Sequence, residues 1–250
     1  LSTLLIYDSL SDFSFDCTKL GEGLSLKIKV IQSEHFDGLL KSVVGENSKF
    51  SKEKLVELTL VTICDELLSR INSHQSFDLK NIESVFLKLD HSDQQILKKN
   101  LSKEFINSIE HEIERTKQGR ESEAKNAISL AGKLVEVTSR DVERLRSIMG
   151  VDDYRFSDLS DKLAIELLQC GIDYFNEFRE TTTDPSVEVL KLFQIAQSFA
   201  LGSISKDRIN ENIEGIKEWI SDKPEREKNR KIATELETIH KLLSGINSYD

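Results

Sequence analysis

Apolar residues recur with the period of an α-helix along most of the chain after residue 50. Val56, Leu60, Ile63, Leu67 and Ile71 are spaced by four, three, four and four residues. This spacing places all five side chains on one face of a helix and so predicts a helix with one buried face.

Helix-start and helix-stop residues divide the C-terminal part into successive helices. A long helix is predicted over residues 158–180. Asp184 and Pro185 are typical of the start of a second helix that ends at Gly202. Ser205 is the predicted N-cap of a third helix, and Pro224 ends it. The side chains predicted to be buried are Leu163, Leu167, Tyr174 and Phe178 in the first helix, Ile209, Ile213, Ile216 and Ile220 in the third, and Ile232, Leu236, Ile239 and Leu243 in a fourth that Gly245 closes.

The segment at residues 114–125 is almost free of apolar side chains (ERTKQGRESEAK). Such a segment is either an exposed helix or a linker, and Gly119 favours the linker. After it, Ser139 is the predicted N-cap of a short helix through Met149, and Gly150 suits the position just past that helix.

The first 33 residues have a different pattern. Residues 24–30 (LSLKIKV) alternate apolar and polar side chains, which is typical of a half-buried strand. Residues 3–7 and 13–17 are weaker strand candidates, and the glycines within 21–23 supply a turn. We therefore predict a small β element of two or three strands over residues 1–33.

The predicted fold class is mainly α, with stacked antiparallel helical hairpins and this small N-terminal β element. Two prolines and eleven glycines are too few for the frequent turns of a β-sandwich or barrel. Short predicted loops make successive helices antiparallel neighbours. The predicted regions are a β element at 1–33, a helical region at 34–118 and a helical-hairpin region at 119–250.

The hairpin predicted at residues 167–196 carries a spaced set of large and small side chains. They are Leu167, Gly171 and Tyr174 on its first helix, and Val189, Phe193 and Ala196 on its second. This spacing resembles a degenerate tetratricopeptide repeat. The chain departs from that family at Cys170, where a Leu is usual, and in a join at 179–184 that is about six residues too long; no second copy follows at the family's period. The resemblance implies a concave surface that binds a peptide or a partner helix.

Charge and cysteine content narrow the classes of function. The chain of 250 residues carries a net charge of −10, from 44 acidic and 34 basic side chains, which argues against direct nucleic-acid binding. A basic stripe between Lys223 and Lys231 is interpreted as a solvated helix face. Three dispersed cysteines fit no disulfide framework or zinc site and suit a reducing compartment, so we expect a cytoplasmic protein. The longest uncharged run, residues 192–205, is too short to span a membrane. The chain begins at Leu1 rather than Met, which leaves open that it is a fragment.

Motifs for catalysis, metals or cofactors are missing from the sequence. His111 and Glu112 lack the second His of a zinc peptidase helix, and the single pair of Glu237 and His240 has no second copy for a di-iron site. Neither a glycine-rich phosphate loop nor a nucleophile elbow occurs. We therefore predict no enzyme activity, no cofactor and no catalytic or metal-binding residues.

Aromatic side chains are concentrated near the resembling hairpin. Most are interpreted as core, but Phe175 lies beside its helix's apolar stripe and Trp219 lies near a helix end, so these two are the predicted partner-binding anchors. We expect a non-catalytic interaction adaptor or a subunit of a larger complex that binds a protein partner through a helical surface. The alternatives are a self-assembling structural protein, which leaves a homo-oligomer open, and the helical domain of an enzyme whose site lies outside this chain.

Overall fold

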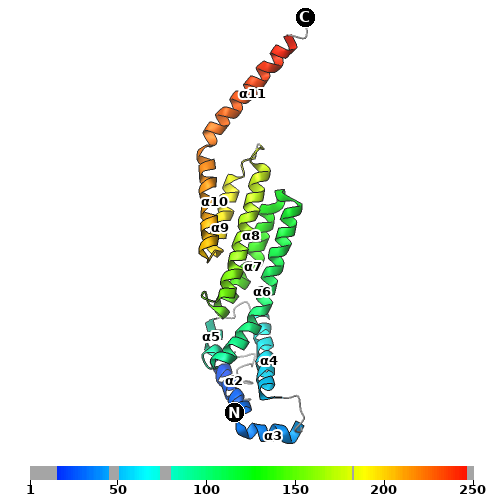
Figure 1. The fold of residues 1–250 in the computed structure, drawn as a ribbon, viewed down its shortest axis with the longest axis vertical. Helices are drawn as coiled ribbons and strands as arrows, with labels where there is room; N and C mark the ends of the chain where they lie inside the picture. Colours follow the sequence, from blue (N-terminus) through cyan, green and yellow to red (C-terminus); the bar gives the residue numbers. More distant parts are fainter. Residues whose placement is uncertain (1–15, 45–50, 74–79, 182, 247–250) are drawn as a thin grey trace. The chain divides into compact units, whose positions relative to one another are not determined.

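Helices account for all the regular secondary structure that is described. The computed structural model describes residues 16–44, 51–73, 80–181 and 183–246, and no strand occurs within those ranges (Figure 1). The mainly α fold is thus confirmed. In chain order the helices are α2 (Cys17–Gln32), α3 (Glu34–Val44), α4 (Lys52–Ser73), α5 (Lys80–Phe86), α6 (His91–Ser122), the 3-10 turn η1 (Ala124–Asn126), α7 (Ala127–Met149), α8 (Tyr154–Phe178), α9 (Ser186–Phe199), α10 (Ser203–Ser221) and α11 (Lys223–Ile246).

The N-terminal segment forms a helix where the β element was predicted. Helix α2 begins after Asp16, whose carboxylate accepts hydrogen bonds from the N–H groups of Thr18 at 3.0 Å and Lys19 at 3.1 Å. This N-cap satisfies amide groups that the first turn leaves without partners. The buried side chains recur at helical spacing, at Leu20, Leu24, Ile28 and Ile31.

The prediction of a strand at residues 24–30 was therefore wrong. Leu24 and Ile28 are buried, whereas Leu26 and Val30 are exposed, so the apolar residues of this run do not share one face. A seven-residue alternation matched a strand by chance, while the helical period extends over all of α2. The strand candidate at 3–7 and residues 13–15 of the one at 13–17 lie outside the described residues, and Cys17 is the first residue of α2.

The predicted turn at residues 21–23 is also helical. A Cβ added to Gly21 would lie 3.0 Å from the Cα of Val85 in α5. The glycine is thus needed for the close approach of α2 and α5 and not for a turn. Lys88 and Glu22 add an exposed ion pair at 3.1 Å beside this contact.

The chain forms two compact units, each of which is described by itself. Unit 1 comprises Leu1–Glu112 and Glu136–Leu159, and unit 2 comprises Ile113–Val135 and Ser160–Asp250. Every unit therefore combines two separate stretches of the chain.

Unit 1 has an apolar core to which α4 contributes its predicted stripe. All five stripe residues, Val56 to Ile71, are buried, and the Ser51 hydroxyl accepts a hydrogen bond from the N–H of Lys54 at 3.3 Å. Near the other end of α4, the Arg144 guanidinium donates to the Ile71 carbonyl at 2.9 Å and to the Asp141 carboxylate at 3.0 Å. Arg144 thus satisfies a carbonyl that the end of the helix leaves free.

The polar segment at 114–125 is helical over most of its length, so the predicted linker was wrong. Helix α6 continues to Ser122, and Gly119 allows the Leu130 side chain of α7 to approach closely. Similarly, α7 is continuous through Ser139, which is no N-cap. Gly150 does lie just past the end of α7, with a φ of 83° that favours glycine, as predicted.

A buried ionic cluster explains why this polar stretch is helical in unit 2. The Arg120 guanidinium donates to both Glu166 oxygens, at 2.9 and 3.3 Å, and to Asp173 at 2.6 Å. Although burial opposes the charge, these hydrogen bonds raise the pKa of Arg120. A polar residue therefore supplies the buried position that an apolar residue would ordinarily occupy.

Asp161 of α8 holds the turn between α9 and α10. Its carboxylate accepts hydrogen bonds from the N–H groups of Leu201 at 2.8 Å and Gly202 at 3.0 Å. Helix α10 consequently begins at Ser203, and the predicted N-cap, Ser205, lies inside its first turn. The prediction missed this because Asp161 is about forty residues away in sequence.

Candidate partner-binding groove

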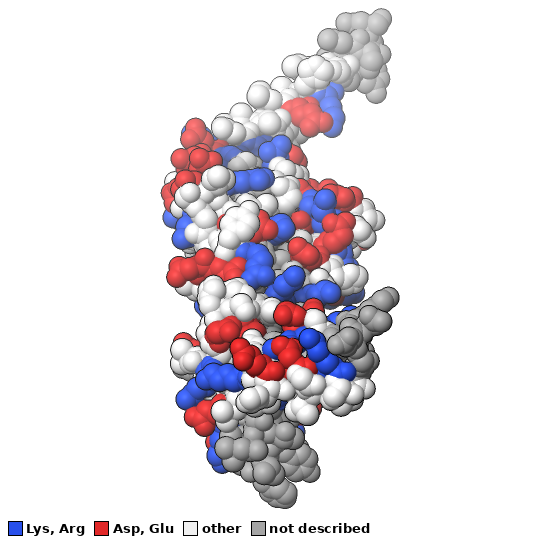
Figure 2. Space-filling model, turned by 60° about the horizontal axis from the view of Figure 1, so that its bottom comes forward, with Lys and Arg blue, Asp and Glu red and all other residues white. Residues whose placement is uncertain are grey.

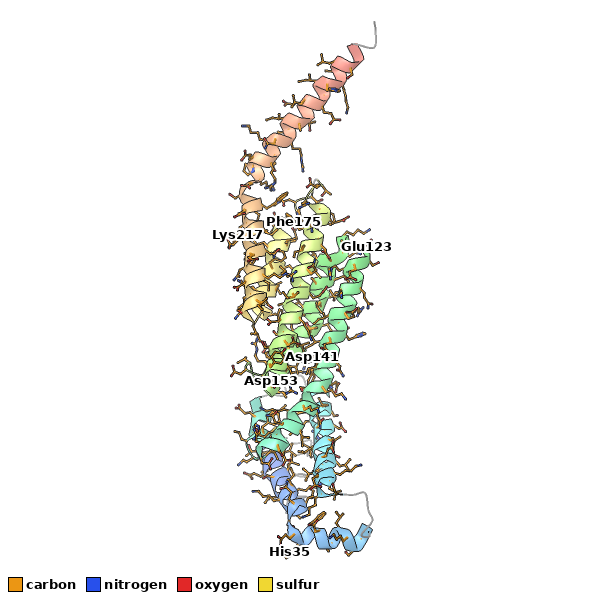
Figure 3. All side chains as sticks on the ribbon, viewed as in Figure 1. His35, Glu123, Asp141, Asp153, Phe175 and Lys217 are labelled. Atoms are coloured by element: carbon orange, nitrogen blue, oxygen red, sulfur yellow. The ribbon has the colours of Figure 1, made fainter. Side chains whose placement is uncertain are left out.

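Unit 2 brings together the two residues that were predicted to bind a partner. Phe175 lies near the C-terminal end of α8 (Figure 3), and Trp219 lies in the last turn of α10. Their rings meet edge to face, with centroids 5.1 Å apart and an interplanar angle of 83°. Both side chains are only partly buried, so each packs against the other and still presents a surface to solvent.

Helix packing forms the floor beneath this aromatic pair. Phe193 of α9 is almost completely buried, and its ring lies directly against Gly171 of α8, where an added Cβ would overlap it. Helices α9 and α10 pack against each other along the buried face of α10. The absence of a side chain at position 171 therefore allows the ring to form the base of a groove.

The groove is mainly apolar and open to solvent. Its volume is about 420 Å³, within the range of about 300–1,000 Å³ typical of ligand pockets. Its lining combines aromatic and aliphatic side chains with a few polar ones: Ile172, Phe175, Asn176, Phe193, Glu211, Asn212, Gly215, Ile216 and Trp219. We call this set the aromatic groove.

A cationic rim borders the aromatic groove at the junction of α10 and α11. The Arg226 guanidinium stacks on Trp219, with its central carbon 3.6 Å from the ring centroid. Trp219 also lines a second, smaller pocket, which contains Arg179, Lys223 and Arg230. One face of Trp219 is thus covered by a positive charge.

Acidic side chains partly neutralise this rim. Lys223 pairs with Asp184 at 2.8 Å, and Asp184 also accepts hydrogen bonds from the N–H and the hydroxyl of Ser186, at 3.0 and 2.6 Å. The hydrogen bonds from Lys223 and Ser186 lower the pKa of Asp184 to about 2. Asp184 is therefore ionised at neutral pH and ties the start of α9 to the start of α11.

The rim was missed because its residues were interpreted as a solvated helix face. Three of the basic residues between 223 and 231, namely Lys223, Arg226 and Arg230, line the pocket next to Trp219. The sequence does place Trp219 close to a helix end, followed by basic residues about one helical turn apart. It does not specify the direction in which α11 leaves α10, and that direction decides whether these basic side chains reach Trp219.

The described residues contain no cluster of side chains suited to binding a metal ion, and their cysteines are buried. Among these residues no three His, Cys, Asp or Glu side chains are positioned to hold a metal ion. The three cysteines are free and buried, and burial raises the pKa of the Cys17, Cys64 and Cys170 thiols to about 12. These thiols are protonated at neutral pH and are therefore poor nucleophiles.

Two further properties concern membrane spans and surface charge. In the described ranges, none of the helices has the length and apolar character needed to cross a membrane. Figure 2 shows Lys and Arg interspersed with Asp and Glu over the visible face, instead of a continuous basic surface.

Comparisons with protein-family models, with curated proteins and with solved structures found no match to this chain.

Proposed function

We propose that this chain is a non-catalytic protein–protein interaction adaptor, or a subunit of a larger complex, that binds a partner in the aromatic groove. One observation carries the proposal: Phe175 and Trp219 meet at the edge of an apolar groove while both remain partly exposed. Partly exposed aromatic side chains at a concave apolar site are typical binding anchors.

The groove and its rim favour a particular kind of partner segment. An apolar side chain of the partner would fill the space between Phe175 and Ile216. An acidic residue nearby would face Arg226 and Arg230 in the rim. A short amphipathic helix with an apolar anchor and a carboxylate about one turn away meets both requirements.

The stacked-hairpin architecture and the likeness to a tetratricopeptide repeat are part of this proposal. Their support is the contact between Gly171 and Phe193, with Leu167, Val189 and Ala196 buried around it. A cytoplasmic location is also proposed, and three free cysteines support it. In this proposal the C-terminal hairpin region provides the binding surface.

The single tryptophan of the chain makes a direct test practical. Trp219 is the only tryptophan, so tryptophan fluorescence reports the surroundings of this one side chain, at the aromatic groove and its cationic rim. We would screen amphipathic helical peptides, with and without acidic residues, for protection of Trp219 from acrylamide quenching. Binding in the groove should reduce quenching, and the acidic peptides should bind more tightly at low salt than at high salt.

A matched pair of variants identifies the site. Phe175→Ala removes a groove anchor and keeps the Trp219 reporter, and it should weaken binding at least tenfold. Tyr154→Ala removes a more exposed aromatic at the other end of α8 and should leave binding unchanged. The proposal is overturned if no peptide protects Trp219, or if the two variants bind equally well while both remain folded.

A second candidate function, self-assembly, is favoured by a different observation. Helix α11 carries an apolar face that packs against nothing else in the described chain. This face does not belong to the aromatic groove.

A further inference from the structure

The apolar face of α11 is exposed along most of the helix. Every residue from Glu227 to Ser244 is exposed, and Figure 1 shows α11 continuing beyond the ends of α8 and α9. A helix without tertiary contacts is only marginally stable in water. The apolar side chains and their exposed fractions are Ile232 (44 %), Leu236 (60 %), Ile239 (52 %) and Leu243 (56 %).

The spacing of these side chains is that of a coiled coil. They are separated by four, three and four residues, and Asn229 lies three residues before the first of them. Alternating steps of three and four define the a and d positions of a heptad repeat. Asn229, Leu236 and Leu243 occupy a, and Ile232 and Ile239 occupy d; we call these five residues the α11 seam.

The seam itself indicates that its partners are further copies of this chain in parallel register. In a parallel assembly of identical helices the Asn229 side chains lie in one layer and hydrogen-bond one another. An antiparallel assembly would place Asn229 among apolar side chains. One flanking pair is compatible with the same arrangement, because Glu235 at g faces His240 at e of the neighbouring copy.

The residue types within the seam favour four strands. Leucine at a combined with isoleucine at d shifts coiled coils away from dimers and toward higher-order assemblies. The apolar face is also wider than a two-stranded seam needs, since Leu242 at g is 65 % exposed and position e holds Ala233. A four-stranded assembly buries these flanking positions, which a dimer would leave in water.

We infer that α11 joins four copies of this chain through a parallel coiled coil built on the α11 seam. The seam uses no residue that lines the aromatic groove, because those residues lie on α8, α9 and α10. Self-assembly therefore does not depend on the proposed partner binding, and four grooves would be presented together.

The test is the mass of the full chain in solution, measured by light scattering and sedimentation equilibrium over a wide concentration range. We expect a species of four times the 28.5 kDa chain mass. Leu236→Glu places four carboxylates in one seam layer and should reduce the species to a single chain. The melting temperature at which unit 1 and unit 2 unfold should not change. Ile204→Glu changes an apolar residue of α10 that is even more exposed, and it should leave the assembly intact.

Strand direction has a separate test. Leu243→Cys should form disulfides between neighbouring copies under mild oxidation, because parallel, in-register helices bring residue 243 of one copy close to residue 243 of the next. The native cysteines are buried and provide no competing cross-link.

Each result either supports or contradicts the inference. A wild-type monomer at all concentrations, a stable dimer or trimer, or equal loss of assembly in Leu236→Glu and Ile204→Glu would overturn it. Failure of Leu243→Cys to cross-link in an intact tetramer would overturn the parallel arrangement. Because groove binding is measured with Phe175→Ala and Trp219 fluorescence, failure of one proposal can be distinguished from failure of the other.

Discussion

Helices α10 and α11 follow one another in the chain and carry the same apolar spacing, yet only one of them is packed. Ile209, Ile213 and Ile216 of α10 are separated by four and three residues, and all are buried in unit 2. The first three apolar residues of the α11 seam have the same separations and are exposed. The spacing thus specifies which face of a helix is apolar, and it does not specify what covers that face.

The difference arises from the neighbours of each helix. Helix α9 precedes α10 by a turn that Asp161 fixes, so the two helices pack against each other. Helix α11 follows Asp222, and its contact with the rest of unit 2 is confined to its first turns, where Lys223 and Arg226 reach Asp184 and Trp219. Beyond that point no neighbouring helix is described.

The largest expected effect compares the same substitution in the two helices. Ile209→Ala should lower the free energy of unfolding by about 2–5 kcal/mol, because it removes a fully buried side chain. Ile232→Ala should change it by less than about 0.5 kcal/mol at concentrations where the chain is monomeric. Urea unfolding measures both. An equal loss in the two variants would show that α11 packs onto its own chain and would remove the contrast.

The next effect tests how tightly the floor of the groove is packed. Gly171→Ala places a methyl group into the Phe193 ring and should cost about 1–3 kcal/mol of unfolding free energy. Gly132→Ala, on an exposed part of α7 with open space around it, should instead add about 0.5–1 kcal/mol. Thermal unfolding of both variants gives the comparison. If Gly171→Ala is stabilising too, then α8 and α9 are not in close contact at this point.

A smaller effect is expected where α10 meets α11. Arg226→Ala removes the guanidinium over Trp219 and should cost about 0.5–1 kcal/mol. It should also increase acrylamide quenching of Trp219. Arg208→Ala, an exposed arginine elsewhere on α10, should do neither. Unchanged quenching in Arg226→Ala would show that Arg226 does not cover the Trp219 ring.

The smallest effect is a pH dependence that reports the same junction. The folded-state pKa of Asp184, about 2, lies below the value of about 3.9 usual for an unfolded chain. The stabilisation by this group is therefore complete above pH 4 and is lost as the pH falls toward 2. Asp184→Asn should remove this part of the acid sensitivity in pH-dependent unfolding.

Lys223→Ala tests the cause of the Asp184 shift. It removes the first contributor to the lowered pKa, so the acid loss should move to higher pH. An acid profile identical to that of the wild type would show that Lys223 does not hold Asp184.

Some features of the fold and the site were readable directly from sequence because they are local. The buried stripe of α4 and the glycine after α7 each depend on residues within a few positions of one another. Phe175 and Trp219 were chosen as candidate binding residues by their position beside an apolar stripe and near a helix end. Their contact with each other was not predicted, since they lie on different helices.

Other features escaped prediction because the deciding partner is distant in sequence. Arg120 makes a polar segment helical through Glu166 and Asp173, and Arg144 reaches the end of α4 from α7. From the local sequence alone, each of these two arginines would be expected at a solvent-exposed position. Burial becomes favourable only once the paired carboxylates or carbonyl are in place.

The sequence by itself determined that this protein is helical, where most of its helices lie and which face of each is apolar. These properties depend on periodicity and on capping, which act within a few turns of chain. Only the tertiary structure decided that α2 is a helix packed on α5, that Phe175 and Trp219 share one groove, and that the α10 stripe is buried while the α11 seam is exposed. Those outcomes depend on contacts between segments far apart in the chain. A local sequence pattern does not specify which distant segment will pack against a given helix face.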